Sequence, residues 1–134
     1  MTPEQLANLA RRGHEIGSHG CSHEILTQRD DAGLERETRE SRRCLAGWTG
    51  QPVRSFCYPN GDVDDRVVQA VQSAGYDCAV TVQSGNNAPG QNRYRLRRWF
   101  IHEQRLTGVY EAASVLLLRM ELCGLAERVF RRKR

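Results

Sequence analysis

Short apolar segments that alternate with helical segments constrain the fold of this chain more than any other feature. The apolar segments centre on Ile16, fill residues 53–58 and run through residues 76–82. The first two of these segments lead into turns rich in glycine, proline and asparagine. Strands that alternate with helices predict an α/β fold with a parallel or mostly parallel sheet. In such sheets, functional residues gather where the strands end at their carboxyl sides.

Turn and capping residues set the expected limits of these elements. Thr2 and Gln5 form a capping-box pattern around Pro3, so a helix is expected to begin there and to end at Gly13. Strands are expected at residues 14–18, 53–58, 76–82 and 95–101, and a final helix near residues 115–125.

Two further helices are expected between the strands. Asp30 or Asp31 caps one, and Asp64 or Asp65 caps the other, which Gly75 closes. One face of the first of these helices is predicted to be buried and consists of Leu34, Thr38, Ser41, Leu45 and Trp48. The charged residues between positions 35 and 43 are predicted to form its exposed face.

The composition fits one globular domain. The chain has 134 residues, of which 39% are hydrophobic and 27% charged, and no apolar run approaches the roughly 18 residues of a membrane span. The first six residues lack a basic and then apolar secretory pattern, which predicts a cytoplasmic location. Five cysteines without a C-x-x-C pair predict reduced, mostly buried thiols rather than a disulfide framework.

The net charge of +4 depends largely on the arginines and the lysine of residues 128–134. A basic tail can bind nucleic acid or anionic lipid. Because no nucleic-acid-binding motif accompanies these charges, we expect a solvated tail and no nucleic-acid partner. Deletion of residues 128–134, followed by loss of salt-sensitive binding, would reveal the alternative.

The segment from Gly13 to His23 carries the strongest chemical signal. His19 and His23 are four residues apart, and this spacing brings two imidazoles together when the backbone turns helically. Imidazole pairs suit Zn²⁺ and related ions. Two polar residues that merely satisfy a turn are the alternative, whereas a zinc finger is excluded because no cysteine pair precedes them. His14 is more simply a structural residue.

Two separated stretches resemble motifs of one family. Gly13-His14-Glu15-Ile16-Gly17-Ser18-His19 through His23, and then Phe56-Cys57-Tyr58-Pro59-Asn60-Gly61, are similar to the second and third motifs of the NodB-homology polysaccharide deacetylases, carbohydrate esterase family 4. The similarity runs from about residue 2 to residue 103. It implies a distorted (β/α) barrel, here partial, and a hydrolase that removes N-acetyl groups from a polysaccharide or sugar.

The resemblance also implies a set of site residues. His19 and His23 match the histidine ligands of one divalent metal ion, expected to be zinc. The backbone N–H of Asn60 matches the donor that stabilises the oxyanion, and Tyr58, Pro59 and Gly61 match the substrate-binding floor. His102 matches the general acid that protonates the leaving amine. Cys57 stands where many relatives carry an arginine that orients the catalytic base.

One family motif is absent. A Thr-Phe-Asp-Asp-Gly-like stretch supplies the base and the aspartate ligand in the family, and nothing before His19 resembles it. We therefore expect a truncated deacetylase domain over residues 1–106, followed by a helical segment with a basic tail over residues 107–134. Exposed edges of an incomplete barrel predict self-association. A catalytically inactive remnant, or a module that binds glycans or a partner chain, is the alternative function.

Overall fold

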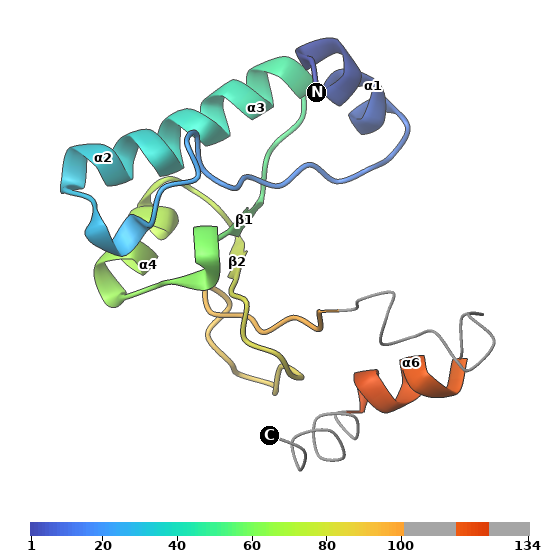
Figure 1. The fold of residues 1–134 in the computed structure, drawn as a ribbon. Helices are drawn as coiled ribbons and strands as arrows, with labels where there is room; N and C mark the ends of the chain where they lie inside the picture. The colour runs from blue at the N-terminus through green and yellow to red at the C-terminus, as the bar shows by residue number, and fades with distance from the viewer. Residues whose placement is uncertain (101–114, 124–134) are drawn as a thin grey trace.

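The computed structural model describes residues 1–100 and 115–123, and its centre is a small parallel sheet (Figure 1). Strands β1 (Ser55–Cys57) and β2 (Cys78–Val80) pair in parallel, with Phe56 opposite Ala79. Single parallel bridges from Ser18 to Phe56 and from Val80 to Leu96 extend the sheet on both sides. The predicted parallel α/β arrangement is confirmed.

Two of the predicted strands are reduced to these single bridges. In the segment 14–18, only Ser18 joins the sheet: its N–H donates to the Ser55 carbonyl, and its own carbonyl accepts from the Cys57 N–H. In the segment 95–101, the side chain of Asn87 hydrogen-bonds both the N–H and the carbonyl of Arg97. A side chain thus takes the backbone groups that a longer strand would have used.

The first and fourth helices begin where the capping residues predict. Helix α1 (Pro3–Arg11) has the complete capping box, in which the Thr2 side chain accepts from the Gln5 N–H and the Gln5 side chain accepts from the Thr2 N–H. Helix α4 (Asp65–Ser73) is capped by Asp64, whose carboxylate accepts from the Val67 N–H at 2.8 Å. Local sequence is therefore sufficient to define where both helices begin.

A long helical rod lies above the sheet in Figure 1, and one of its turns is widened. It consists of α2 (Asp31–Glu35), the π-helical segment η2 (Arg36–Glu40) and α3 (Ser41–Thr49). Asp30 caps it through a 2.8 Å hydrogen bond from the Gly33 N–H. The rod ends at Gly50, which has a φ of 66°, and glycine adopts this left-handed conformation without a steric cost.

The buried face of this rod only partly matches the prediction. Leu34, Thr38 and Ser41 are buried, but Trp48 is 47% exposed. Glu37 was predicted to lie on the charged exposed face, and this prediction is wrong because its side chain is fully buried. It follows Leu34 by three positions and precedes Ser41 by four, so it lies on the buried stripe.

Aromatic rings fill the core beneath the rod. Phe56 contacts Tyr58 and Tyr76 with ring centroids 5.5 and 5.1 Å apart, and Val67 and Val71 of α4 complete this cluster. The short turns η1 (Leu26–Gln28) and η3 (Pro59–Gly61) connect the larger elements. The geometry of η3 places the third-motif residues at the end of β1.

The last described element is α6 (Val115–Leu122), within the predicted terminal helix. His102 and the basic residues 128–134 lie outside the described residues, as does the end of the predicted 95–101 strand. Within the described ranges, no helix is both long and apolar enough to cross a membrane. The boundary predicted at residues 106–107 stays a prediction.

Candidate metal and deacetylation site

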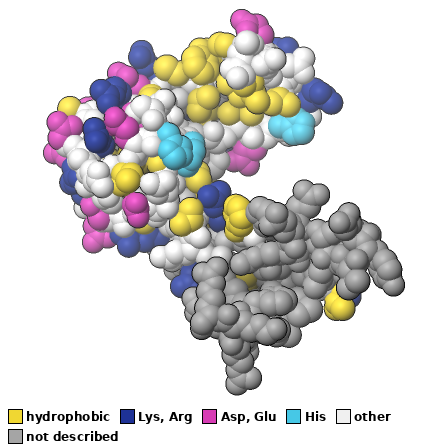
Figure 2. All heavy atoms as spheres, viewed as in Figure 1, with side chains coloured by type: hydrophobic (Ala, Val, Ile, Leu, Met, Phe, Trp, Pro, Cys, Tyr) yellow, Lys and Arg dark blue, Asp and Glu magenta, His cyan; other side chains and the backbone are white. Residues whose placement is uncertain are grey.

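The two histidines of the second motif lie side by side at the carboxyl edge of the sheet. The rings of His19 and His23 meet edge to face, with centroids 4.7 Å apart. Both side chains are exposed, and histidine side chains are visible on the surface in Figure 2. His23 has a φ of 59°, a left-handed backbone conformation that turns the chain at the second imidazole. The structure thus brings together the predicted ligand pair.

A hydrogen bond fixes the tautomer of His19. Its Nδ1 lies 2.6 Å from the carbonyl oxygen of Cys57. A carbonyl can only accept, so Nδ1 must carry the proton and Nε2 must hold the free lone pair. Metal-binding histidines are commonly oriented in this way by a carbonyl on the other ring nitrogen. The bond also links the two motifs, because Cys57 belongs to the second stretch of resemblance.

A buried carboxylate holds the loop between the two histidines. Glu37 Oε2 accepts from the backbone N–H groups of Cys21 and Ser22 at 2.8 and 3.0 Å, and Oε1 accepts from the Ser22 hydroxyl at 2.7 Å. Burial alone would raise the pKa of Glu37. The hydrogen bonds from Ser22 and Cys21, together with the charge of Arg36, outweigh burial and lower that pKa below its ordinary value of 4.5.

A second contact holds the start of the same loop. The Ser18 hydroxyl donates to Ser41 Oγ at 2.9 Å, and Tyr76 lies within 3.2 Å of the same Ser41 oxygen. The Tyr76 hydroxyl also donates to the Thr38 carbonyl at 2.9 Å. Thr38 and Glu37 belong to the π segment η2, and Ser41 follows it directly. Such widened turns are frequent at functional sites.

The third-motif turn lies next to this loop and is strongly constrained. Asn60 has a φ of 56° and Gly61 a φ of 79°. A Cβ atom at Gly61 would lie 2.8 Å from the Val82 backbone nitrogen, so only glycine fits. The N–H of Asn60 has no acceptor among the described residues, which leaves it available as a donor.

Tyr58 anchors the start of this turn in the core. Its side chain is fully buried, and its hydroxyl donates to the Tyr94 carbonyl at 2.8 Å. Pro59 is also buried. A role of Tyr58 or Pro59 in substrate binding would therefore depend on their backbone or on the shape that they give to the turn. Their assignment as substrate-binding residues stays a prediction.

Two acidic side chains near the histidines, those of Glu15 and Glu24, already have other partners. Glu15 accepts from the Ser55 hydroxyl at 2.8 Å, and Glu24 pairs with Arg29 at 3.3 Å. Asp62, in the third-motif loop, is exposed. In the described ranges, no group of three or more His, Cys, Asp or Glu residues could hold a metal ion. The pair therefore offers two nitrogen ligands, and water or a group from elsewhere would have to complete the coordination.

The cysteine between the two histidines, Cys21, does not resemble a catalytic nucleophile. Partial desolvation by neighbouring atoms and then the negative charge of Glu37 raise the pKa of the Cys21 thiol, so it stays protonated near neutral pH. Cys21, Cys44, Cys57 and Cys78 form no disulfide, as predicted. The prediction that the cysteines are mostly buried is wrong: Cys21, Cys44 and Cys123 are exposed, and Cys21 is exposed because it lies in the loop that presents the histidines.

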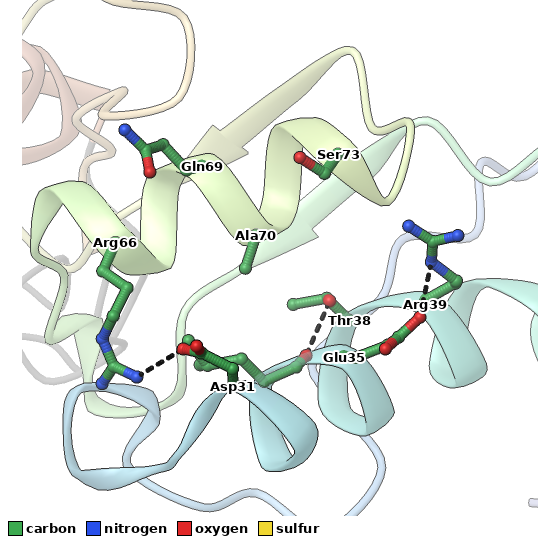
Figure 3. Close-up of a pocket in the computed structure, with 9 residues that line it drawn as sticks. Asp31, Glu35, Thr38, Arg39, Arg66, Gln69, Ala70 and Ser73 are labelled. Carbon is green, nitrogen blue, oxygen red and sulfur yellow. Dashed lines mark hydrogen bonds and ion pairs between the residues drawn. The ribbon is translucent and has the colours of Figure 1, made fainter.

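A groove between the rod and α4 is distinct from this site (Figure 3). It has a volume of about 400 Å³, and Arg66 reaches across it from α4 to Asp31 at 3.3 Å. Glu35 and Arg39 form a second ion pair on its wall, also at 3.3 Å. Its charged groups are thus paired with one another, and none of the predicted site residues lines it.

Sequence reasoning missed Glu37, although a signal was present. The spacing of Leu34, Glu37 and Ser41 places the glutamate on the apolar face of the helix, where an ionised carboxylate needs hydrogen-bond donors. The glycine-rich loop around Gly20 supplies those donors. A Cβ atom at Gly20 would lie 2.7 Å from Glu37 Oε2, so the glycine is what allows the carboxylate to approach.

The molecule is thus a parallel α/β domain with a histidine pair at the carboxyl edge of its strands, where the functional residues of such sheets gather. The sequence profile described as polysaccharide deacetylase matches residues 1–79. The chain belongs to the polysaccharide deacetylase family, and the NodB-homology resemblance is confirmed.

A curated relative agrees with this membership. The chain is 28% identical over 78 residues to a peptidoglycan-N-acetylglucosamine deacetylase of Bacillus cereus, an alignment that covers 58% of this chain and 36% of that protein. The curated relatives are much longer: the aligned region spans only about a third of their length, 35% and 36%.

The solved structures show the fold. A polysaccharide deacetylase from Bacillus cereus has a TM-score of 0.74 at 22% identity and covers 90% of this chain and 36% of its own. A pseudoenzyme of carbohydrate esterase family 4 from Bacillus anthracis has a TM-score of 0.54 at 19% identity, with 57% and 27% covered. A mutant of that pseudoenzyme has restored enzymatic activity.

Proposed function

We propose that the chain is a metal-dependent hydrolase domain that removes N-acetyl groups from a polysaccharide or sugar. One observation carries the proposal: His19 and His23 lie 4.7 Å apart between ring centroids, and the Cys57 carbonyl leaves Nε2 of His19 free. Zn²⁺ is the proposed ion, since it accepts imidazole nitrogen readily. When bound, such an ion polarises an amide carbonyl and lowers the pKa of water.

The residues of the third motif would act on the acetyl group. Asn60 is an exposed residue, and its N–H is proposed as a donor to the oxygen that becomes negative when water attacks the carbonyl. The absence of a side chain at Gly61 allows this turn to lie close to Val82. His102 is proposed as the acid that protonates the leaving amine. The substrate class follows the relative that acts on peptidoglycan N-acetylglucosamine.

Release of acetate from chito-oligosaccharide or peptidoglycan fragments tests the activity. The proposal predicts acetate release by the purified chain, loss of the activity on chelation and recovery on addition of Zn²⁺. A His14→Ala variant is the matched control, because His14 is exposed and lies outside the ligand pair. Activity that is insensitive to both chelation and His19→Ala would contradict the proposal.

A catalytically silent domain is the second candidate function. It is favoured by the finding that Glu15 and Glu24 are engaged elsewhere, and by the likeness to a family pseudoenzyme. This candidate predicts that the chain binds N-acetylated oligosaccharide without releasing acetate. Chelator-sensitive acetate release by the same preparation would exclude it.

A further inference from the structure

We infer that Glu37 is a positioning residue for the histidine pair: its buried carboxylate fixes the loop from His19 to His23 and thereby the separation of the two imidazoles. The inference rests on the proposed metal site for its functional meaning. Its structural basis is independent of a metal, because every contact involved lies within the described chain.

The first step of the argument is the number of bonds that a single side chain makes. Glu37 accepts three hydrogen bonds from two consecutive residues, Cys21 and Ser22, at 2.7 to 3.0 Å. These two residues lie directly between the histidines. Few other groups hold this stretch: Cys21 Sγ makes a 3.4 Å contact with the Arg36 carbonyl, which is a weak bond.

The second step is the cost of placing a carboxylate there. Glu37 is fully buried, and an ionised carboxylate is stable in such a place only when its oxygens accept hydrogen bonds or pair with charge. The charge of Arg36 is 3.8 Å away and on a side chain that is 55% exposed. The loop donors are therefore the principal partners, and the loop and the carboxylate depend on each other.

The third step is the fit of the loop around the carboxylate. Gly20 has a φ of 85°, and a Cβ atom there would lie 2.7 Å from Glu37 Oε2. Both the backbone conformation and the missing side chain are thus matched to Glu37. On the other side, the π segment η2 contains Glu37 itself, so the carboxylate that the loop surrounds extends from the widened turn of the rod.

Amide hydrogen exchange on the full chain tests this inference. In Glu37→Gln, the Cys21 and Ser22 amides should exchange at least about tenfold faster than in the wild type. The neutral amide forms weaker hydrogen bonds than the ionised carboxylate, so local opening of the loop costs less free energy. Val71 reports the global fold, and its amide should keep its protection. Glu40→Gln removes the same charge from an exposed position of the same helix and should leave both loop amides unchanged.

Zn²⁺ titration by calorimetry provides the readout that a purely structural role would not change. Loss of a group that orients metal ligands typically weakens metal binding about 10- to 100-fold, and this is the expected effect of Glu37→Gln but not of Glu40→Gln. Ser22→Ala removes one of the three bonds without touching the carboxylate. This variant should lose Zn²⁺ affinity to an intermediate extent. It also provides the test if the Glu37 variant does not fold.

The outcomes separate the two claims. Unchanged exchange at Cys21 and Ser22 in both Glu37→Gln and Ser22→Ala overturns the inference. Faster loop exchange with unchanged Zn²⁺ affinity also overturns it, since the loop would then move without moving the ligands. A wild-type chain that takes up no Zn²⁺ contradicts the proposed function. The role of Glu37 can then still be tested without a metal, from the nuclear Overhauser effect between the rings of His19 and His23 in the wild type and in Glu37→Gln. An equal effect in the two proteins would show that Glu37 does not set the separation of the rings.

Discussion

Single residues with unusual backbone angles define the site. His23 and Asn60 are the non-glycine residues with positive φ in the described chain, at 59° and 56°. His23 lies in the second motif and Asn60 in the third, and strained backbone of this kind is typical of functional sites. Gly20 and Gly61 complete the pattern, because each faces a group that a Cβ atom would displace.

Replacement of Gly61 by alanine should destabilise the domain. The left-handed conformation costs a non-glycine residue about 1–2 kcal/mol, and the contact with the Val82 backbone adds about 1–3 kcal/mol of overpacking. Gly90→Ala is the control, since Gly90 has a φ of 82° and nothing within 4 Å of its Cβ position. Urea unfolding measures the free energy of unfolding of both variants. Equal losses in Gly61→Ala and Gly90→Ala would show that the Val82 contact has no effect.

At this scale the sequence predicted which residue types occupy the site but not how they are held. The His-x-x-x-His spacing and the Pro-Asn-Gly turn were sufficient to place both motifs at strand ends. The tautomer of His19 depends on the Cys57 carbonyl, 38 positions away in sequence. The role of Glu37 likewise depends on a contact with a loop that lies 15 and 16 positions before it. Contacts of this kind cannot be predicted from the spacing of residues along the chain.

At the scale of elements, caps were predicted well and strand lengths poorly. Thr2, Asp30 and Asp64 cap helices through local hydrogen bonds to residues three positions on, and local bonds follow from local sequence. Strand lengths depend on partners elsewhere in the sheet. Ser18 and Leu96 each contribute one bridge, although the residues around them alternate as a longer strand would.

Loss of the Asp64 cap should weaken α4 and with it the core. Asp64→Ala removes the 2.8 Å bond from the Val67 N–H, and a change of this kind costs about 0.5–2 kcal/mol. Asp62→Ala is the matched control, because Asp62 is exposed and lies just before the helix. The free energy of unfolding from urea titration decides: an Asp62 variant as unstable as the Asp64 variant would contradict the role of the cap.

The stability of the whole molecule should decline at both ends of the pH scale. The pKa of Glu37 is lower in the folded chain than its ordinary value of 4.5. Its stabilising contribution is therefore present above that value and is lost as the pH falls through the folded pKa. Burial raises the pKa of Tyr58 and of Tyr76 above their ordinary value of 10.0. Their contribution is present below that value and is lost as the pH rises further.

Thermal melting from about pH 3 to pH 11 checks this expectation. Stability should be nearly constant between about pH 5 and pH 9 and should fall outside that window. Glu37→Gln should flatten the acid limb and leave the alkaline limb intact. An acid limb as steep in this variant as in the wild type would show that other carboxylates cause it.

Family membership and the parallel α/β class of the molecule were predicted from two motifs and from the alternation of elements. The activity, the identity of the metal and the expected self-association stay proposals, as does the cytoplasmic location. The chain aligns with about a third of its curated relatives. For that reason, the central question is whether the histidine pair of this chain binds a metal by itself.

Metal content after equilibration with Zn²⁺ and removal of excess ion answers this question most directly. The wild-type chain and His14→Ala should each hold about one Zn²⁺ per chain, whereas His19→Ala should hold almost none. Equal zinc content in His19→Ala and the wild type would contradict the assignment of His19 and His23 as the metal site.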